Sequence, residues 1–326
     1  MPARLITIIF KFFILIPFVI PESACTQNTN VPVKILSTIK HSGLWTIEWS
    51  PDDKYFAIGG DDSILWIYKA SEPSAYKSYP MKHMVRGIAW HPEGKLLAVS
   101  TMREIQILNM ATGKFTEFVG RYGGRGIGWN YNGELLAIGD GAGIIHIWNK
   151  DGKLIRSIPK ENNDSYLSIH WHPSKNIIAA VGTEIWLFDT SGRQLPQIKH
   201  RKEIAGLLTV RWHPSGEFFA TGDNGPDEIE SIIQFWKEDG VLIKSLHGSK
   251  GEYRNIRWNN VGSLLASASD GLRIWTKEGQ LLYTGKTKDI LWGLAWNRSG
   301  NRIITGSFDG DINLWTDKAT PLMKVQ

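Results

Sequence analysis

The sequence predicts an all-β protein, a seven-bladed β-propeller whose blades are four-stranded antiparallel sheets. Three observations predict this fold: a tryptophan motif that returns seven times, a turn at the same place after each copy, and alternating apolar and variable residues between turns. The chain has 326 residues, 15 of them tryptophan, and shows no helical period of useful length. Because one four-stranded blade cannot bury both of its faces, the blades must stack around an axis and cover one another.

The innermost strand of each blade is marked by an apolar residue, one variable residue and a tryptophan. The seven tryptophans of this motif are Trp49, Trp90, Trp129, Trp171, Trp212, Trp258 and Trp296. The steps between them are 41, 39, 42, 41, 46 and 38 residues, which is the period of a four-stranded propeller blade. Each of these tryptophans brings a large apolar side chain with one N–H group that needs a partner.

The remaining strands of each blade follow in a fixed order. A turn such as SPDD, HPEG or NRSG comes first, because Pro, Asn, Asp, Ser and Gly supply the dihedral angles of a tight turn. A second strand follows, as in residues 96–100, and then a turn that often holds an aspartate. A third alternating strand ends on a large residue, and an outer strand such as 153–158 or 241–246 completes the blade.

Closure of the ring requires the last blade to be joined to the first. Residues 33–39, with the sequence VKILSTI, have the pattern of the other outer strands, and we expect them to supply the outer strand of blade seven. The tail at 321–325 could compete for that place. The sequence leaves both possibilities open and favours a clasp built from N-terminal and C-terminal strands.

The seven copies resemble the WD40-repeat family over residues 33–326. The resemblance is clearest in LLASASDGLRIWTKEG and RIITGSFDGDINLW, which are similar to transducin-β-like repeats. The chain departs from the family because the Trp-Asp dipeptide is absent, with Phe188-Asp189 the nearest match, and no Gly-His pair opens a repeat. The resemblance therefore implies the fold, with an incomplete side-chain hydrogen-bond network.

The first 32 residues have the pattern of a targeting segment. Residues 5–20 are apolar except for Lys11, too short for a membrane span of about 20 residues and typical of a secretory signal peptide. Ser23-Ala24-Cys25 resembles the end of the bacterial lipoprotein box, whose cysteine is lipidated, although Glu22 replaces the apolar residue of that box. We expect residues 1–24 to be a signal peptide, 25–32 a polar tether and Cys25 the lipidation site.

This interpretation places the protein outside the cytoplasm, anchored to a membrane by lipid on Cys25 and facing the periplasm or the cell surface. A plain secreted form, an uncleaved signal anchor and a cytoplasmic protein are the alternatives.

Composition and motifs argue against several classes of function. A single cysteine excludes an intrachain disulfide and a cysteine-based zinc site, and a net charge of +5 from scattered residues gives no basis for nucleic-acid binding. Residues 120–126 resemble an RGG-type RNA segment but fall in the loop that opens blade three. No serine nucleophile elbow, HExxH motif or phosphate-binding loop is present. We expect no catalytic residue, no cofactor and no metal site.

The candidate binding residues are found four positions before each core tryptophan. These positions hold Trp45, Arg86, Arg125, Leu167, Leu208, Arg254 and Trp292. The family resemblance implies that they lie around one mouth of the channel, where partners commonly bind. Since blade seven neighbours blade one, the two tryptophans and three arginines form one continuous arc, and these residue types dominate binding hot spots.

The opposite side of the same face is predicted to be acidic. The longest step between repeats reflects an insert at 223–231, which carries Asp223, Asp227, Glu228 and Glu230. The arc itself has a simpler alternative interpretation, in which Trp45 and Trp292 are packed between blades and the arginines are only solvated.

The function we expect is a non-enzymatic protein-interaction scaffold, a monomeric propeller that docks a protein segment carrying acidic groups. One alternative is a propeller enzyme of the hydrolase or lactonase type with its site at the channel mouth. A second alternative is recognition of a glycan through the aromatic arc.

Overall fold

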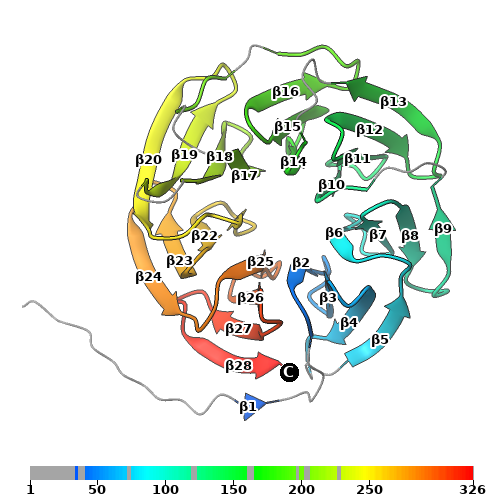
Figure 1. The fold of residues 1–326 in the computed structure, drawn as a ribbon, viewed down its shortest axis with the longest axis horizontal. Helices are drawn as coiled ribbons and strands as arrows, with labels where there is room; N and C mark the ends of the chain where they lie inside the picture. The colour runs from blue at the N-terminus through cyan, green and yellow to red at the C-terminus, as the bar shows by residue number, and fades with distance from the viewer. Residues whose placement is uncertain are drawn as a thin grey trace, which may run out of the picture. The chain divides into compact units, whose positions relative to one another are not determined.

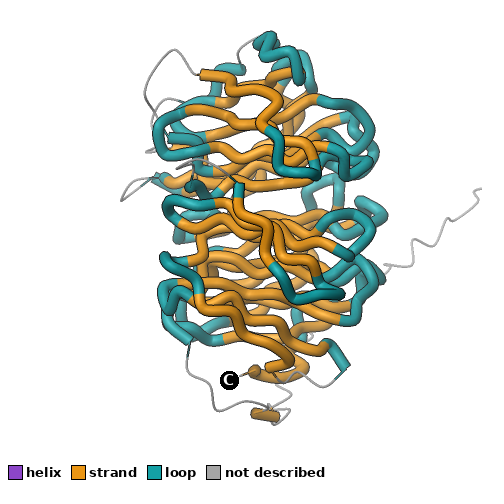
Figure 2. The backbone as a smooth tube through the Cα atoms, turned by 90° about the vertical axis from the view of Figure 1, so that its right-hand side faces the viewer, coloured by secondary structure: helices purple, strands orange, loops and turns teal. Residues whose placement is uncertain are grey.

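The structure is a computed structural model that describes residues 34–35 and 41–325, apart from gaps at 72–74, 119–122, 160–164, 196–197, 202–205 and 226–228. Its strands form seven sheets arranged in a ring, one sheet for each repeat (Figure 1). Figure 2 shows the ring turned by 90°, and the described residues contain strands, turns and loops without a helix. The prediction of a seven-bladed all-β propeller is confirmed.

The blades follow one another along the chain, and within each blade the strands run from the channel outward in sequence order. Blade one contains β2 (Leu44–Trp49), β3 (Tyr55–Gly60), β4 (Ile64–Lys69) and β5 (Ala75–Pro80). Blade two contains β6 (Val85–Trp90), β7 (Leu96–Thr101), β8 (Ile105–Asn109) and β9 (Phe115–Glu117). Blade three contains β10 (Gly126–Trp129), β11 (Leu135–Gly139), β12 (Ile144–Asn149) and β13 (Leu154–Pro159). Blade four contains β14 (Ser168–Trp171), β15 (Ile177–Val181) and β16 (Ile185–Asp189). Blade five contains β17 (Gly206–Trp212), β18 (Phe218–Asn224), β19 (Ser231–Lys237) and β20 (Leu242–Ser249). Blade six contains β21 (Asn255–Trp258), β22 (Leu264–Ala268), β23 (Gly271–Thr276) and β24 (Leu281–Lys286). Blade seven contains β25 (Leu291–Trp296), β26 (Arg302–Ser307), β27 (Ile312–Thr316) and β28 (Pro321–Val325).

Blade four departs from the four-stranded pattern in the described residues. Its sheet has three strands, and the chain beyond β16 adds only two isolated bridges, Ile185 with Ile198 and Phe188 with Gln194.

The tryptophans that define the repeat pack between blades and also join them by hydrogen bonds. Trp171 Nε1 donates to the carbonyl oxygen of Gly128 at 2.8 Å, and Trp129 Nε1 donates to Ala89 at 3.1 Å. In each case the acceptor is the residue just before the tryptophan of the preceding blade. The same bond links Trp90 to Glu48 and Trp296 to Arg257. The buried N–H group thus finds its partner on the neighbouring inner strand at four of the seven junctions.

The Trp-His-Pro histidines form a second set of links between blades. His91 Nε2 lies 3.1 Å from the carbonyl oxygen of Gly133, and His213 Nε2 lies 2.9 Å from that of Gly262. Gly133 has a φ of +76°, and a Cβ there would collide with the His91 imidazole. These histidines are therefore structural, since each occupies its own junction.

The closing strand of blade seven comes from the C-terminal end of the chain. β28 pairs antiparallel with β27, while β1 (Lys34–Ile35) pairs parallel with β28 as a fifth strand. The expectation that residues 33–39 supply the fourth strand is wrong for Lys34–Ile35, which lie outside β28, whereas the expected clasp of N-terminal and C-terminal strands is present. Residues 33 and 36–39 lie outside the described residues. The physical reason is that a short turn carries the chain from β27 directly into β28, and a local hairpin costs less loop-closure entropy than pairing with the distant N-terminal segment.

Blade seven is also joined to blade one by a single carboxylate. Asp53, in the first turn of blade one, accepts hydrogen bonds from Arg298 N at 2.6 Å and Ser299 N at 3.0 Å. Asn297 Nδ2 and Ser299 Oγ donate to the same carboxylate. Asp53 has a φ of +59°, a conformation that Asp tolerates better than most residues.

Candidate functional site

A β-bulge directs the candidate positions away from the core. In blade one the pairing passes from Leu44 opposite Gly60 to Thr46 opposite Gly59, so Trp45 has no cross-strand partner. The same shift passes over Arg86, Leu208 and Trp292 in blades two, five and seven. A bulge inserts one extra residue into a strand and changes the direction of its side chain.

Three of these bulge side chains, from Trp45, Arg86 and Trp292, meet Arg254, which lies just before β21, in one stack built from four blades. The Trp45 and Trp292 ring centroids are 4.3 Å apart, with the planes tilted by 53°. The Arg86 guanidinium lies 4.7 Å from the Trp45 centroid, and the Arg254 guanidinium lies 4.6 Å from the Trp292 centroid. We call this stack the ladder; in space its side chains follow one another in the order Arg86, Trp45, Trp292, Arg254. All four side chains keep part of their surface exposed.

Two further side chains extend the ladder. Arg125 of blade three places its guanidinium 5.5 Å from the Trp45 centroid. Phe308, between β26 and β27, stacks on Trp292 at 4.8 Å and is 49% exposed. Trp45 is fixed on its other side, because its Nε1 donates to Asp61 Oδ1 at 2.6 Å. The five residues that the sequence singled out therefore lie together, and Phe308 is a neighbour that the repeat register did not indicate.

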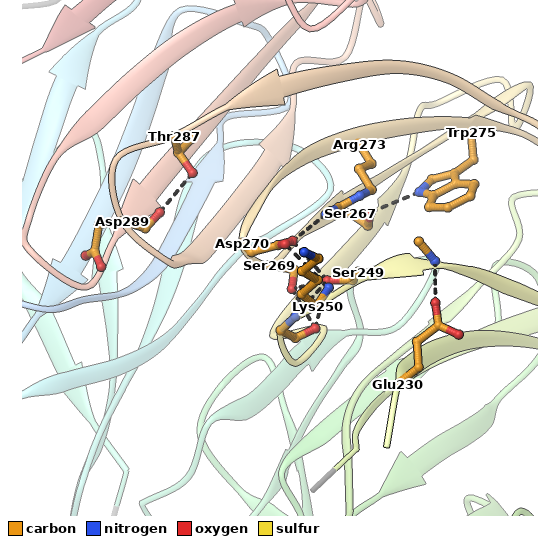
Figure 3. Close-up of polar contacts among 12 residues, drawn as sticks. Glu230, Ser249, Lys250, Ser267, Ser269, Asp270, Arg273, Trp275, Thr287 and Asp289 are labelled. Atoms are coloured by element: carbon orange, nitrogen blue, oxygen red, sulfur yellow. Dashed lines mark hydrogen bonds and ion pairs between the residues drawn. The ribbon is translucent and has the colours of Figure 1, made fainter. Parts of the chain in front are cut away.

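The segment that leads into Arg254 is held by a polar network between blades five and six (Figure 3). Asp270, in the turn between β22 and β23, accepts from Ser249 Oγ at 3.0 Å and pairs with Arg273 at 2.6 Å. Ser249 also contacts Ser269 Oγ at 2.7 Å. These bonds fix the end of β20, and with it the path of the chain toward Arg254.

A small cavity lies below the ladder in the channel. Its volume is about 50 Å³, enough for a few water molecules. Thr209 Oγ1, Asn255 Oδ1 and Arg86 Nε face no hydrogen-bond partner although each atom is buried. The cavity is lined by these three residues together with Trp45, Arg125, Arg254 and the side chains deeper in the channel. Unpaired buried polar atoms of this kind favour a polar ligand.

The electrostatics of this upper mouth favour an anion. Burial, followed by repulsion from Arg254 and Arg86, lowers the pKa of Arg125 to about 10, so it remains protonated at neutral pH. Arg254 forms an ion pair with Glu252. Among the described residues no acidic side chain forms an ion pair with Arg86 or Arg125. In the part of the chain that the structure describes, these three guanidinium groups therefore have one ion-paired carboxylate between them, Glu252.

The other end of the channel holds a second polar group that the sequence analysis missed. The residue just before the core tryptophan is small in three blades, as Ala89, Gly128 and Ala295. In the other four blades it is Glu48, His170, Arg211 or Arg257. A cavity of about 300 Å³ lies among these four side chains. The signal that could have indicated them is the concentration of charge at the variable position of the repeat motif.

The predicted acidic side of the face is built differently from expectation. Asp223 is buried, with 1% of its surface exposed, and its carboxylate forms an ion pair with Arg201 at 2.8 Å. Glu230 binds His247 Nδ1 at 2.6 Å and the amide of Gly248. Both carboxylates are thus already engaged by neighbouring groups of the chain. Asp227 and Glu228 lie outside the described residues.

Other predicted features have no counterpart to examine. Cys25 and residues 120–122 lie outside the described residues. In the described part of the chain, no three His, Cys, Asp or Glu side chains gather as metal ligands would. The same residues include no helix with the length and apolar character needed to cross a membrane.

Comparison with known proteins identifies the type of repeat. The model of the anaphase-promoting complex subunit 4 WD40 domain matches residues 47–120, and that of the WD domain, G-beta repeat, matches residues 279–316. The anaphase-promoting complex subunit cdc20 of Dictyostelium discoideum is 23% identical over 49% of this chain and 32% of its own length. The SIR4-interacting protein SIF2 of Saccharomyces cerevisiae is 29% identical over 54% of this chain and 31% of its own length. These matches therefore span about a third of each relative.

The fold has a counterpart among solved structures. A chain of Kuenenia stuttgartiensis hydrazine synthase superposes with a TM-score of 0.77, at 13% identity, over 86% of this chain and 97% of that one. At this identity the likeness shows the fold alone. The repeat models matched at 47–120 and 279–316 and the seven sheets of the ring therefore support placing the chain with the WD40-repeat propellers.

Proposed function

We propose that this propeller is a protein-interaction scaffold that docks an acidic segment of a partner protein at the upper mouth of its channel. The observation that carries the proposal is the ladder, a partly exposed stack of two tryptophans between two arginines, with Arg125 beside it. The names of two relatives, an anaphase-promoting complex subunit and a SIR4-interacting protein, describe proteins that associate with other proteins.

The geometry favours a carboxylate as the group that the partner inserts. Stacking on the indole rings holds Arg86 and Arg254 in place before a partner arrives, so less side-chain entropy is lost on binding. A carboxylate would also supply the negative charge that Arg86 and Arg125 lack. The unpaired Nε of Arg86 offers one donor for it.

The same geometry makes the glycan alternative less favourable. A sugar ring stacks on an open aromatic face, but Trp45 already has Arg86 at 4.7 Å and Trp292 at 4.3 Å. A propeller enzyme would need a nucleophile, a general base or a metal centre at the mouth. The charged side chains that line the upper cavity are five arginines and one carboxylate, Glu48, beside the hydroxyl groups of Thr46, Ser168 and Thr209. We therefore place the protein among non-enzymatic scaffolds.

Export and anchoring form part of the proposal through Cys25. The apolar segment at 5–20 and the Ser-Ala-Cys sequence support a lipidated protein held at a membrane. Expression of the full chain with Cys25→Ser in a bacterial host tests this directly. Wild type should fractionate with membranes and incorporate labelled fatty acid, and the variant should do neither; equal fractionation of the two forms would refute lipid anchoring.

The docking proposal is tested by crosslinked capture from membranes of cells that express the full chain. Wild type is compared with an Arg86→Ala/Arg254→Ala variant and with Arg156→Ala, a matched control on the exposed face of outer strand β13. A partner that is captured by wild type and Arg156→Ala but lost from the double variant supports docking at the ladder. A partner that all three forms capture equally refutes it.

A further inference from the structure

We propose that the lower mouth of the channel, at the opposite end of the inner strands from the ladder, binds a small oxyanion through Arg211, Arg257 and His170. The chemical class is a carboxylate or phosphate group, which presents at least two oxygen atoms. This site goes beyond the docking proposal, because it uses the residue just before the core tryptophan and not the bulge position. Glu48, Arg211 and Arg257 lie between the two mouths, since they line both the cavity below the ladder and the lower cavity.

The space for such a ligand comes from unequal side chains at one position of the repeat. Ala295 is small and lines the cavity, and the larger side chains at the same repeat position in four other blades reach it from the remaining sides. The cavity of about 300 Å³ that results is lined by Glu48, His170, Arg211, Arg257, Asn259 and Asn260, with prolines and tryptophans at its margin. It is large enough for an anion with its bound water.

Arg211 has an unused edge of the shape that binds oxyanions. Its Nη1 donates to the carbonyl oxygen of Val210 at 2.7 Å and to Ser168 Oγ at 3.2 Å. Its Nε is buried and has no hydrogen-bond partner. The Nε–Nη2 edge of a guanidinium is one that forms paired bonds with a carboxylate or phosphate. Because a buried charged donor without an acceptor is costly, a bound oxyanion would complete the bonding of this group.

The local charges leave an excess positive charge in the cavity. Arg257 donates from Nε to the carbonyl oxygen of Leu294 at 3.1 Å and from Nη2 to the carboxylate of Glu48. Glu48 is the acidic side chain that lines the cavity, and it faces two guanidinium groups. Burial and the charge of Arg257 hold the pKa of Arg211 well below its usual range. An anion beside Arg211 would balance this charge.

His170 supplies a neutral donor to the same cavity. The backbone N–H of Trp212 donates to His170 Nδ1 at 3.1 Å, so the neutral ring carries its hydrogen on Nε2. Burial, and then the charges of Arg211 and Arg257, hold the pKa of His170 well below its usual range. The ring is therefore uncharged at neutral pH and can donate one hydrogen bond without adding charge.

The site is tested by titrating the purified full chain in detergent with inorganic phosphate, sulfate and acetate at neutral pH. Sodium chloride keeps the ionic strength constant, and calorimetry and thermal unfolding report binding. Wild type should bind at least one of the three anions saturably and unfold at a higher temperature in its presence. Binding of acetate alone would identify a carboxylate ligand, whereas binding of phosphate and sulfate would identify a phosphate group.

Variants locate the binding within the channel. Arg211→Gln should lose binding at least tenfold, and Arg156→Gln, on the exposed face of outer strand β13, should retain it. Because Arg211→Gln can weaken folding, ¹⁵N NMR of the wild-type imidazoles gives a second measurement, in which the His170 Nε2 signal should shift during the titration. No saturable binding, equal binding by Arg211→Gln, or a His170 signal unmoved by a bound anion would overturn the proposal.

Discussion

Replacement of Trp292 by alanine separates a binding role from a packing role. The indole has two aromatic contacts, with Trp45 at 4.3 Å and Phe308 at 4.8 Å, and one cation–π contact with Arg254 at 4.6 Å. Each aromatic contact is worth about 0.5–1 kcal/mol and the partly exposed cation–π contact about 0.5 kcal/mol, so the free energy of unfolding should fall by about 2 kcal/mol. The matched control is Trp212→Ala, in an inner strand and 2% exposed, which should cost about 3–5 kcal/mol.

Urea unfolding, followed by tryptophan fluorescence, measures both losses in the full chain. Crosslinked capture of the partner is then compared under conditions in which each variant is folded. Trp292→Ala should lose capture despite its smaller loss of stability. Phe308→Ala should reduce capture with a loss of about 0.5–1 kcal/mol, because its half-exposed side chain makes one aromatic contact with Trp292. A stability loss for Trp292→Ala equal to that of Trp212→Ala would refute the reasoning and assign Trp292 to the core.

Three further predictions concern the ring itself. Asp53→Ala should cost about 1 kcal/mol more than Asp53→Gly in urea unfolding, because both lose the bonds to blade seven but only alanine resists the positive φ. Burial raises the pKa of Asp140, but hydrogen bonds from His146 and two backbone amides outweigh burial, so the pKa lies below its usual value. The free energy of unfolding should therefore fall as pH drops below about 4, and the fall should be smaller in Asp140→Asn. Gly133→Ala should cost about 2 kcal/mol or more in thermal unfolding, because its Cβ meets His91 and its φ is positive.

The fold was predictable because the repeat reports the same physical requirement seven times. Each core tryptophan fills a gap between blades, and the distance to the next one along the chain is the length of one blade. The step from Trp49 to Trp90 therefore already shows the repeat that places the inner strand in every other sheet. The closing strand was not predictable from pattern. Residues 33–39 and 321–325 both have the alternation of an outer strand, and what decides between them is the entropy of loop closure.

The residues of the candidate site could be predicted from the sequence, but the β-bulge that directs their side chains could not. Strict alternation along β2 would place Trp45 on the same side as Trp49, between blades, because the two are four residues apart. The bulge between Leu44 and Thr46 shifts the register by one residue and turns Trp45 toward the channel. No residue type in the sequence marks this bulge.

The lower site was missed for a different reason. Glu48 and Arg257 form an ion pair across 209 positions of sequence, and each contributes a single variable residue of its own repeat. A site assembled from one residue per blade leaves no local motif.

The channel changes the meaning of the net charge of the chain. A value of +5 from 37 basic and 32 acidic side chains indicates no ligand, because most of these charges are scattered over a solvated surface. Five arginines nevertheless face the channel, namely Arg86, Arg125, Arg211, Arg254 and Arg257. The neighbouring carboxylates are Glu48, Glu252 and Asp61. Five positive charges against three leave an excess of two. Walls of low dielectric concentrate that field at both mouths, so an anion is attracted to either end although the surface as a whole is nearly balanced.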